Sequence, residues 1–407
     1  MVKILHLSDI HLGSSFSHGK INPKTKVNTR LEDFVKSLTT CIDRAINEPV
    51  DVVLFGGDAF PDSTPAPYIQ SAFAHQFRRL AEANIPTVLL VGNHDQHSQG
   101  NGGASLSIYD TLAIPNFIVG EKIKTHVIRT KSGEIQIITL PWVTHATLLT
   151  RPETEGLSLE KINQLLIQKI EPILEGEIRQ LNPEIPTILL GHLMAERANI
   201  GAERFLSVGK GFKIPLSMLI RPEYDFVALG HVHKHQNLNK KNNPPVVYPG
   251  SIERVDFSEE KEEKGYVMID IDEQKNVNWE FCPLITRPFI TIDIDLSKSE
   301  LVEEDLIKAI ESKPIKDAVV RVIYRLRSEQ LDSIGLDKIS QALNPAHSYT
   351  LKAELISEQT RARLPELGIG KSLDPIEALT TYLENRDDLQ ELIPDMLSAA
   401  ENLLSVR

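Results

Sequence analysis

Residues 87–95 of this chain read TVLLVGNHD, an apolar run that stops abruptly at a Gly-Asn-His-Asp motif. The run Thr87–Val91 consists of β-branched and aliphatic residues, which is typical of a buried strand. The glycine that follows lets the backbone turn sharply and approach a ligand closely. The stretch therefore predicts a core strand that ends at a functional loop.

Four other apolar runs end in a similar motif. They are Ile4–Ser8 before Asp9-Ile10-His11, Val52–Phe55 before Gly57-Asp58, Thr187–Leu190 before Gly191-His192, and Phe226–Leu229 before Gly230-His231-Val232-His233. Helical patterns at Asn28–Ile46 and Pro67–Ala83 separate the first three strands, which indicates β-α-β units and a largely parallel core. Because loops at the carboxyl ends of such strands meet in one crevice, we expect the five motifs to converge.

The motifs supply nitrogen and oxygen donors and no sulfur: Asp9, His11, Asp58, Asn93, His192, His231 and His233. Side chains at i and i+2 of an extended segment face the same way, so Asp9 with His11, and His231 with His233, are each expected to point into one cavity. Seven donors are too many for one tetrahedral site and suit two ions that share a carboxylate. Imidazole and carboxylate together suit Mn, Fe or Zn better than Ca or Mg. Two such ions about 4 Å apart clamp the oxygens of a phosphoryl displacement and activate a bridging water, which predicts hydrolysis without a covalent enzyme intermediate.

Each motif alone is weak, because a single Gly-Asp or Gly-His usually marks a turn or a core residue. Five in succession, each after an apolar strand, favour the metal site. The remaining histidines lack such a setting and are interpreted as structural or surface residues: His6, His18, His75, His126, His145 and His347. His97 and His235 flank motifs, and we expect them at the surface.

The composition bounds the class of protein. A chain of 407 residues with 41% hydrophobic and 25% charged residues predicts a globular protein of two or three domains. The net charge of −12 argues against a uniformly basic nucleic-acid binder but permits a local groove in which metal ions supply positive charge. There is no signal-peptide pattern and no run of about 20 apolar residues. Cys41 and Cys282 are far apart in sequence, so we expect a cytosolic protein without a disulfide framework.

Beyond Leu112 the pattern changes to short strands with turns and one helical segment, Ser158–Gln180. Two layers of sheet covered by helices would accommodate the core, so the expected fold is α/β with a β-sandwich. Pro283–Pro288 marks a boundary, after which strands and helices restart. The predicted elements there are Ile290–Leu296, Val302–Ser312, Ala318–Leu326, Leu336–Leu343 and Tyr349–Ile356.

The five motifs resemble those of the calcineurin-like metallophosphoesterase superfamily. The sequences HLSDIHLG (6–13), GHVHKHQ (230–236) and YPGSIER (248–254) resemble more narrowly the SbcD-type nuclease component of bacterial SbcCD exonuclease complexes. The resemblance covers about the first 280 residues well and the remainder loosely. It implies a phosphoesterase domain at 1–285, an α+β capping domain that helps select DNA at 286–365, and a linker with C-terminal helices at 366–407.

The resemblance also implies residue roles. Asp9, His11 and His233 hold one metal, Asn93, His192 and His231 hold the other, and Asp58 bridges them. His94 contacts the scissile phosphate and assists the leaving group. The alternative for His94 is a hydrogen bond to its neighbour Asp95. Family sequences usually place a polar residue three positions after the bridging Asp to orient this histidine, but Pro61 stands there with Asp62 next to it. Either Asp62 has taken over this role or His94 is oriented otherwise.

By resemblance, the chain is a Mn-dependent DNA nuclease of the 3'-5' exonuclease and endonuclease type that processes double-stranded ends and hairpins. Its partner would be an SbcC-like ABC-type ATPase, with two copies of this chain in a heterotetramer. The apolar stripe Leu389–Leu404 would bind the ATPase or pack on its own domain, and Pro394 would interrupt or kink that helix near its start. Arg321 and Arg325 would meet phosphate or face solvent.

The alternative functions are a small-molecule phosphatase or cyclic-nucleotide phosphodiesterase, and an idle scaffold for the ATPase. The long extension after the core favours the nuclease, and the complete donor set disfavours the scaffold.

Overall fold

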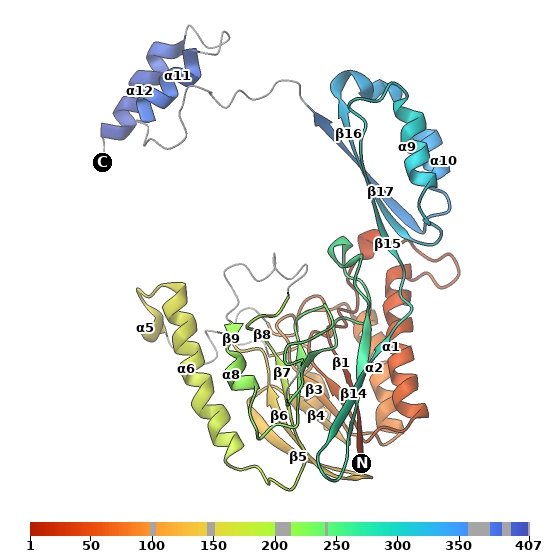
Figure 1. The fold of residues 1–407 in the computed structure, drawn as a ribbon, viewed down its shortest axis with the longest axis vertical. Coiled ribbons are helices and arrows are strands. Elements are labelled where there is room, and N and C mark those ends of the chain that lie inside the picture. Colours follow the sequence, from red (N-terminus) through yellow and green to blue (C-terminus); the bar gives the residue numbers. More distant parts are fainter. Residues whose placement is uncertain are drawn as a thin grey trace.

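The computed structural model describes residues 1–97, 103–144, 151–199, 213–240, 243–356, 375–384 and 392–405. The described strands of the amino-terminal part form two six-stranded sheets that pack face to face (Figure 1). His145, Leu389 and the predicted linker 368–371 lie outside the described residues.

The first sheet carries three of the five motifs. Its strand order is β14-β13-β1-β2-β3-β4, in which β1 to β4 are parallel and β13 and β14 are antiparallel additions. The strand bounds are β1 (Val2–Leu7), β2 (Val52–Phe55), β3 (Thr87–Leu90), β4 (Phe117–Gly120), β13 (Gly265–Ile271) and β14 (Val277–Pro283). Strand β14 is not among the strands predicted from the sequence, although its apolar residues Val277, Trp279 and Phe281 alternate and pack against the core between the sheets.

The second sheet carries the other two motifs. Its order is β11-β12-β10-β7-β6-β5, with β6, β7, β10 and β12 parallel. The strand bounds are β5 (Lys124–Thr130), β6 (Gly133–Leu140), β7 (Thr187–His192), β10 (Phe226–Gly230), β11 (Gln236–Asn237) and β12 (Val246–Tyr248). A short pair lies beside this sheet: β8 (Met194–Ala195) and β9 (Lys213–Ile214).

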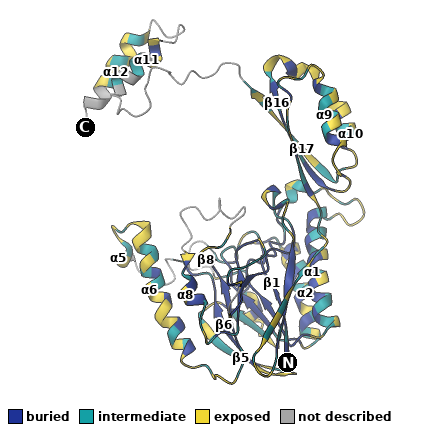
Figure 2. Cartoon of the chain, viewed as in Figure 1, coloured by how far each residue is buried: buried dark blue, intermediate teal, exposed yellow. Residues whose placement is uncertain are grey.

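Three hydrophobic clusters hold these layers together. The cluster between the sheets takes side chains from both, such as Ile4 and Leu54 from the first and Ile188 and Phe226 from the second. The outer face of each sheet is covered by helices, and the buried residues lie in these layers (Figure 2). The helices are α1 (Thr29–Asn47), α2 (Pro67–Glu82) and α3 (Ser107–Thr111) on the first sheet, and α5 (Arg151–Thr154), α6 (Leu159–Ile178) and α8 (Leu216–Leu219) on the side of the second. The predicted β-sandwich flanked by helices is confirmed.

The sequence periodicity explains why α6 packs where it does. Leu166, Ile170, Leu174 and Ile178 recur every four residues and are all buried against the second sheet. Ser158 caps the helix with its side chain, which accepts a hydrogen bond from the backbone N–H of Lys161.

A smaller unit follows the sandwich, and we call it the cap. It is a three-stranded parallel sheet with helices on one face, and its own apolar cluster lies between them. Its elements are β15 (Phe289–Asp295), α9 (Val302–Glu311), β16 (Val319–Arg327), α10 (Leu336–Ala342) and β17 (Ser348–Ile356). Figure 1 shows the cap rising from the end of β14.

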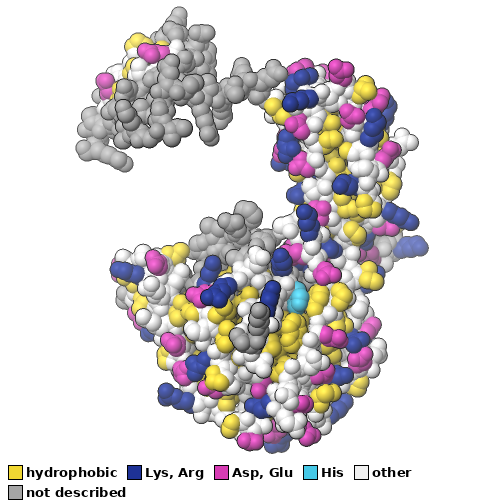
Figure 3. Space-filling view, in the orientation of Figure 1, with side chains coloured by type: hydrophobic (Ala, Val, Ile, Leu, Met, Phe, Trp, Pro, Cys, Tyr) yellow, Lys and Arg dark blue, Asp and Glu magenta, His cyan; other side chains and the backbone are white. Residues whose placement is uncertain are grey.

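Arg321 and Arg325 of the cap, which were expected to meet phosphate or to face solvent, both have partners within the protein. The Arg321 guanidinium lies 4.3 Å from the Phe257 ring centroid, at the junction with the core. Arg325 forms ion pairs with Asp293 at 2.6 Å and Glu354 at 3.2 Å. On the face of the cap seen in Figure 3, basic and acidic side chains are interspersed. The interpretation as a phosphate-binding pair therefore loses support.

The described part of the carboxyl-terminal segment consists of two helices, α11 (Pro375–Glu384) and α12 (Ile393–Ser405), which pack against each other. The sequence predicts a single helical segment with Pro394 near its start. In the structure, Pro394 is the second residue of α12, where a missing N–H costs nothing, so it begins the helix without interrupting it. Among the described residues, no helix combines the length and the apolar character needed to span a membrane.

Candidate metal centre

The five predicted motifs lie together at the carboxyl ends of their strands. Strands β1, β2 and β3 of the first sheet and β7 and β10 of the second lead into them, so the loops of both sheets meet at one edge of the sandwich. The predicted carboxylates and imidazoles are buried, with exposed fractions between 0% and 6%: Asp9, His11, Asp58, His192, His231 and His233. Asn93 and His94 are half-buried. The predicted convergence is therefore observed.

The local backbone differs from the expected one. Asp9 has φ 52° and His11 has φ 46°, so the segment is left-handed where an extended one was predicted. Asp58 (φ 60°) and His231 (φ 98°) share this region. The side chains converge because the loops are tied together, not because of strand alternation. For example, the backbone N–H of Asp9 donates to the Gly57 carbonyl at 3.0 Å, and that of His11 donates to the Asp58 carbonyl at 3.0 Å.

Asp9, His11 and His233 form the first group of donors, and one donor atom of each lies within 4.8 Å of the others. The Nε2 atoms of His11 and His233 are 3.0 Å apart. The Asp9 carboxylate accepts hydrogen bonds from the Ser8 hydroxyl at 2.5 Å and from the backbone N–H of His231 at 3.0 Å, which fix its orientation.

Asp58, His192 and His231 form the second group, again with donor atoms within 4.8 Å. The Asn93 Oδ1 atom joins them, at 2.9 Å from His192 Nε2 and 2.8 Å from His231 Nδ1. Asp58 Oδ2 lies 3.4 Å from His192 Nε2 and 3.6 Å from His11 Nε2. This carboxylate oxygen therefore stands between the two groups.

The hydrogen bond made by the ring nitrogen of His192 that points away from the donor groups shows whether a cation fits between them. His192 Nδ1 lies 2.6 Å from the Gly56 carbonyl oxygen, which can only accept, so Nδ1 carries the proton. The lone pair of a neutral His192 then points from Nε2 at the oxygens of Asn93 and Asp58. Lone pairs that face one another in a buried site require a proton or a cation between them. The donor set fits metal ions of the imidazole-binding class.

The pKa values of the imidazoles agree with this arrangement. Burial lowers the pKa of His231 to about 3 and that of His11 well below its usual range, so both rings are neutral and able to bind a metal. Burial, the largest single effect, would lower the pKa of His192, but the Asp58 carboxylate, the charge of Asp9 and the hydrogen bond to the Gly56 carbonyl together raise this pKa to about 9. The buried oxygens around His192 Nε2 thus favour a positive charge at this position.

His94 lies beside the first group, and one of its ring nitrogens is within 4.8 Å of donor atoms of His11 and Asp58. Its ring lies edge-on to His11, with centroids 4.9 Å apart, and its backbone N–H donates to Asp58 Oδ1 at 2.8 Å. Its Nδ1 atom lies 2.7 Å from the carbonyl oxygen of Pro61. The Asp62 side chain instead accepts from the backbone N–H of Thr64 at 2.8 Å. The proposal that Asp62 orients His94 is therefore wrong, and a backbone carbonyl has this role.

Asp95 supports the loops and does not bind His94, so that alternative is wrong as well. Its carboxylate accepts from the backbone N–H groups of Gly92 at 2.9 Å, Asp58 at 2.8 Å and Ala59 at 3.1 Å. Burial, together with the charge of Asp58, raises the pKa of Asp95 to about 6. Asp95 thereby joins the loop after β2 to the loop after β3.

Two residues near the site are missed by the sequence analysis. The Trp142 ring lies over the His231 ring, with centroids 4.7 Å apart. Trp142 comes shortly after β6 in the sequence, and the end of that strand carries no polar motif that would have drawn attention to it. Glu259 Oε1 lies 2.7 Å from His233 Nδ1. Glu259 belongs to the run DFSEEKEEKG (256–265), which looks like an exposed charged loop, so only its spatial contacts identify it.

The sequence comparisons agree with this geometry. Residues 2–235 match the family model described as calcineurin-like phosphoesterase. The SbcD component of the nuclease SbcCD from Staphylococcus epidermidis is 26% identical over 309 residues, which cover 75% of each chain. The DNA double-strand break repair protein Mre11 from Archaeoglobus fulgidus is 21% identical over 382 residues, covering 90% of this chain and 76% of that one.

Among solved structures, a dimetal phosphatase from Danio rerio aligns with a TM-score of 0.38 and 10% identity, covering 66% of this chain and 92% of that one. The two sequence relatives confirm the narrower resemblance to SbcD-type nucleases. The family model confirms the prediction of a phosphoester hydrolase and matches more than half of the sequence. The chain therefore belongs to the calcineurin-like phosphoesterase family.

Proposed function

We propose that this chain is a DNA nuclease that hydrolyses phosphodiester bonds with two divalent metal ions. The observation that carries the proposal is the position of Asp58 Oδ2 between two groups of buried donors. Asp9, His11 and His233 would hold one ion. The second ion would be held by Asn93, His192 and His231, and Asp58 would bridge the pair.

Mn is the ion that we propose first, with Fe or Zn as alternatives, because the donors combine imidazoles with oxygen atoms. Such a pair supplies a hydroxide nucleophile at neutral pH and neutralises charge on the phosphate. The protein orients the Asp58 carboxylate through one of its oxygens. Oδ1 accepts a hydrogen bond from the His94 backbone N–H, and Oδ2 is thereby directed at both groups of donors.

His94 would contact the scissile phosphate and assist the departing oxygen. Its Nδ1 proton is committed to the Pro61 carbonyl, so Nε2 is the atom available to substrate. The ring is half-buried beside His11, which places it at the rim of the site where a phosphate could reach it. With Nδ1–H held by the carbonyl, Nε2 donates only when the ring is the doubly protonated imidazolium, and in that form Nε2–H can give a proton or a hydrogen bond that stabilises charge developing on the leaving oxygen.

DNA is proposed as the substrate because both sequence relatives are named for nuclease or DNA-repair functions and their alignments cover 75% and 90% of this chain. We propose domains at 1–285 for catalysis, 286–365 for substrate selection and 366–407 for binding an SbcC-like ATPase. Two copies of the chain would act in a heterotetramer on double-stranded ends and hairpins. The apolar residues of α12 would lie in a groove of the partner's coiled coil.

A comparison of three substrates tests the substrate class. The purified chain is supplied with Mn²⁺ and offered linear duplex DNA, a cyclic dinucleotide and an aryl phosphate, with Asp58→Asn as the inactive control. We expect cleavage of the duplex, and labels at the 5' and 3' ends give its polarity. Efficient turnover of the cyclic dinucleotide or the aryl phosphate, with intact duplex, would establish the phosphodiesterase or phosphatase alternative instead.

A further inference from the structure

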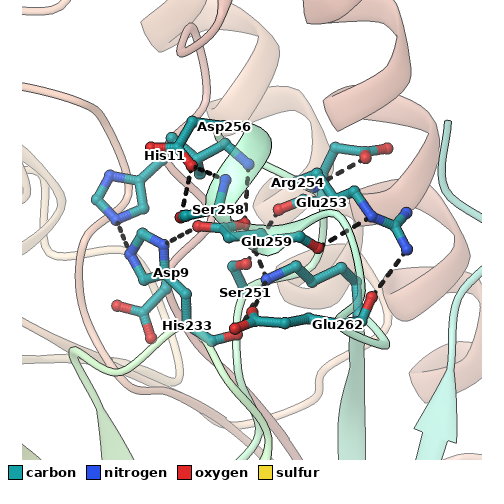
Figure 4. Close-up of polar contacts among 12 residues, drawn as sticks. Asp9, His11, His233, Ser251, Glu253, Arg254, Asp256, Ser258, Glu259 and Glu262 are labelled. Atoms are coloured by element: carbon teal, nitrogen blue, oxygen red, sulfur yellow. Dashed lines mark hydrogen bonds and ion pairs between the residues drawn. The ribbon is translucent and has the colours of Figure 1, made fainter. Parts of the chain in front are cut away.

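A buried carboxylate lies directly behind one of the histidines of the site. Glu259 ends the short turn η2 (Phe257–Glu259) and is fully buried. Its Oε1 atom lies 2.7 Å from His233 Nδ1, on the side of the ring opposite to the His11 contact (Figure 4). Because a carboxylate only accepts, His233 carries its proton on Nδ1 and presents the Nε2 lone pair to the first group of donors.

The other oxygen of Glu259 is fully used within the protein. Oε2 accepts from the backbone N–H of Val255 at 2.9 Å and forms an ion pair with Lys264 Nζ at 2.8 Å. Lys264 is 1% exposed, and its ammonium also donates to the His233 carbonyl oxygen at 3.1 Å and to Glu262 Oε2 at 2.8 Å. The ion pair therefore holds the ring and the backbone of His233 at once.

The two groups of donors differ in this respect. His192, in the second group, is held on its far side by the neutral carbonyl of Gly56. His233, in the first group, is held by a negative charge. A carboxylate behind a histidine fixes its tautomer and makes the opposite nitrogen a stronger donor to a metal, and losing such a partner typically weakens metal binding by about 10- to 100-fold.

We propose that Glu259, with its charge balanced by Lys264, is the positioning residue for the metal site formed by Asp9, His11 and His233. The inference rests on the proposed metal pair and not on the proposed DNA substrate. It makes the two sites unequal, because the carboxylate strengthens one site and leaves the other unaffected. Burying this ion pair has a desolvation cost, and the role at His233 gives a reason for its presence.

The test is Mn²⁺ binding to the full chain, measured by titration calorimetry and by electron paramagnetic resonance that counts bound ions. Glu259→Gln keeps the size and the acceptor oxygen but removes the charge. We expect one of the two Mn²⁺ ions to bind about 10- to 100-fold more weakly and the other to bind as in the wild type. Wild-type affinity at both sites would overturn the proposal.

Glu253→Gln is the matched control. Glu253 lies in the same loop and is 1% exposed, but it accepts from the backbone N–H of Arg254 and pairs with Arg30 at 3.6 Å, away from the histidines. We expect this variant to keep both Mn²⁺ affinities. Equal loss of metal in the two variants would mean that the loop needs its buried carboxylates only to fold, which would also overturn the proposal.

The double variant Glu259→Gln, Lys264→Met separates positioning from burial of charge. We expect Glu259→Gln to lower the melting temperature, because it leaves the buried Lys264 ammonium without its counter-charge, and we expect Lys264→Met to recover part of that loss without restoring the weakened Mn²⁺ site. Recovered affinity in the double variant would show that Glu259 serves only to neutralise Lys264. These outcomes are distinct from failure of the nuclease proposal. If the chain binds two Mn²⁺ ions unequally but does not cleave DNA, the role of Glu259 stands and the proposal of DNA as the substrate fails.

Discussion

His94 Nδ1 lies 2.7 Å from the carbonyl oxygen of Pro61, and this contact fixes the orientation of a ring that lies edge-on to His11. A backbone carbonyl orients the imidazole without adding a second negative charge beside Asp58. The loop itself is held by Asp95, which accepts from the backbone N–H groups of Asp58 and Ala59. The orientation of His94 is thus built from the main chain of the loop after β2.

Replacing His94 tests its role in the reaction. His94→Gln should lower phosphodiester hydrolysis by about 10²- to 10⁴-fold, because the group that assists the leaving oxygen is lost. Bound Mn²⁺, measured by elemental analysis, should stay at the wild-type level, since neither proposed set of ligands includes His94, although one of its ring nitrogens lies within 4.8 Å of donor atoms of His11 and Asp58. A variant that loses metal would place His94 among the ligands.

Asp62 provides the complementary test. Its side chain accepts from the backbone N–H of Thr64 at 2.8 Å and from the Thr64 hydroxyl at 3.0 Å, and it is exposed. Asp62→Ala should therefore keep the rate of hydrolysis within about twofold of the wild type, as expected for a surface change away from special features. A loss of rate comparable to that of His94→Gln would restore Asp62 as the orienting residue.

Trp142 gives an optical signal for the second group of donors. Its ring lies 4.7 Å from that of His231, whereas Trp279, the other tryptophan, lies in β14 against Phe226. Paramagnetic Mn²⁺ bound near His231 should quench Trp142 fluorescence in proportion to occupancy of that site. Trp142→Phe should abolish the quenching while calorimetry still detects both ions. Undiminished quenching in this variant would mean that Mn²⁺ binds elsewhere.

Local sequence patterns predicted the strands that lead into the site and the side chains that lie together at their ends, whereas the role of these side chains as metal ligands stays a prediction. Runs such as Thr87–Val91 are apolar along their whole length, and a motif follows each one. What the sequence could not predict are contacts between distant segments. The Asp9 backbone is left-handed because it bonds to the Gly57 carbonyl, and Glu259 reaches His233 from a loop whose composition looks solvent-exposed. Tertiary contacts decide such positions, and residue type alone carries no signal of them.

Asp95 should be essential for the stability of the site. Asp95→Ala would leave the backbone N–H groups of Gly92, Asp58 and Ala59 buried without their acceptor. At about 1–3 kcal/mol for each unsatisfied donor, the loss should be at least about 3 kcal/mol. We expect a lower melting temperature by calorimetry and reduced Mn²⁺ content. Unchanged melting would mean that water or another group replaces the carboxylate.

Arg287 should control how firmly the cap is held on the core. Its guanidinium donates to the Asp33 carboxylate of α1 at 2.6 and 2.7 Å, and to the Asp317 carbonyl of the cap at 2.9 Å. The Arg287 and Asp33 side chains are 18% and 15% exposed, so solvent screens this pair only in part. Arg287→Ala should weaken the attachment by about 2 kcal/mol, a magnitude typical of hydrogen bonds to charged groups.

Hydrogen exchange followed by mass spectrometry can locate this effect. The amide of Val319, which donates to the Pro288 carbonyl at the junction, should exchange faster in Arg287→Ala, while the amides of β1 and β2 keep their protection. Arg325→Ala is the control, because its ion pair with Asp293 is confined to the cap and exposed to solvent, where such pairs contribute little to stability. If both variants leave exchange at Val319 unchanged, apolar packing of Phe257, Phe289 and Val319 holds the cap without help from Arg287.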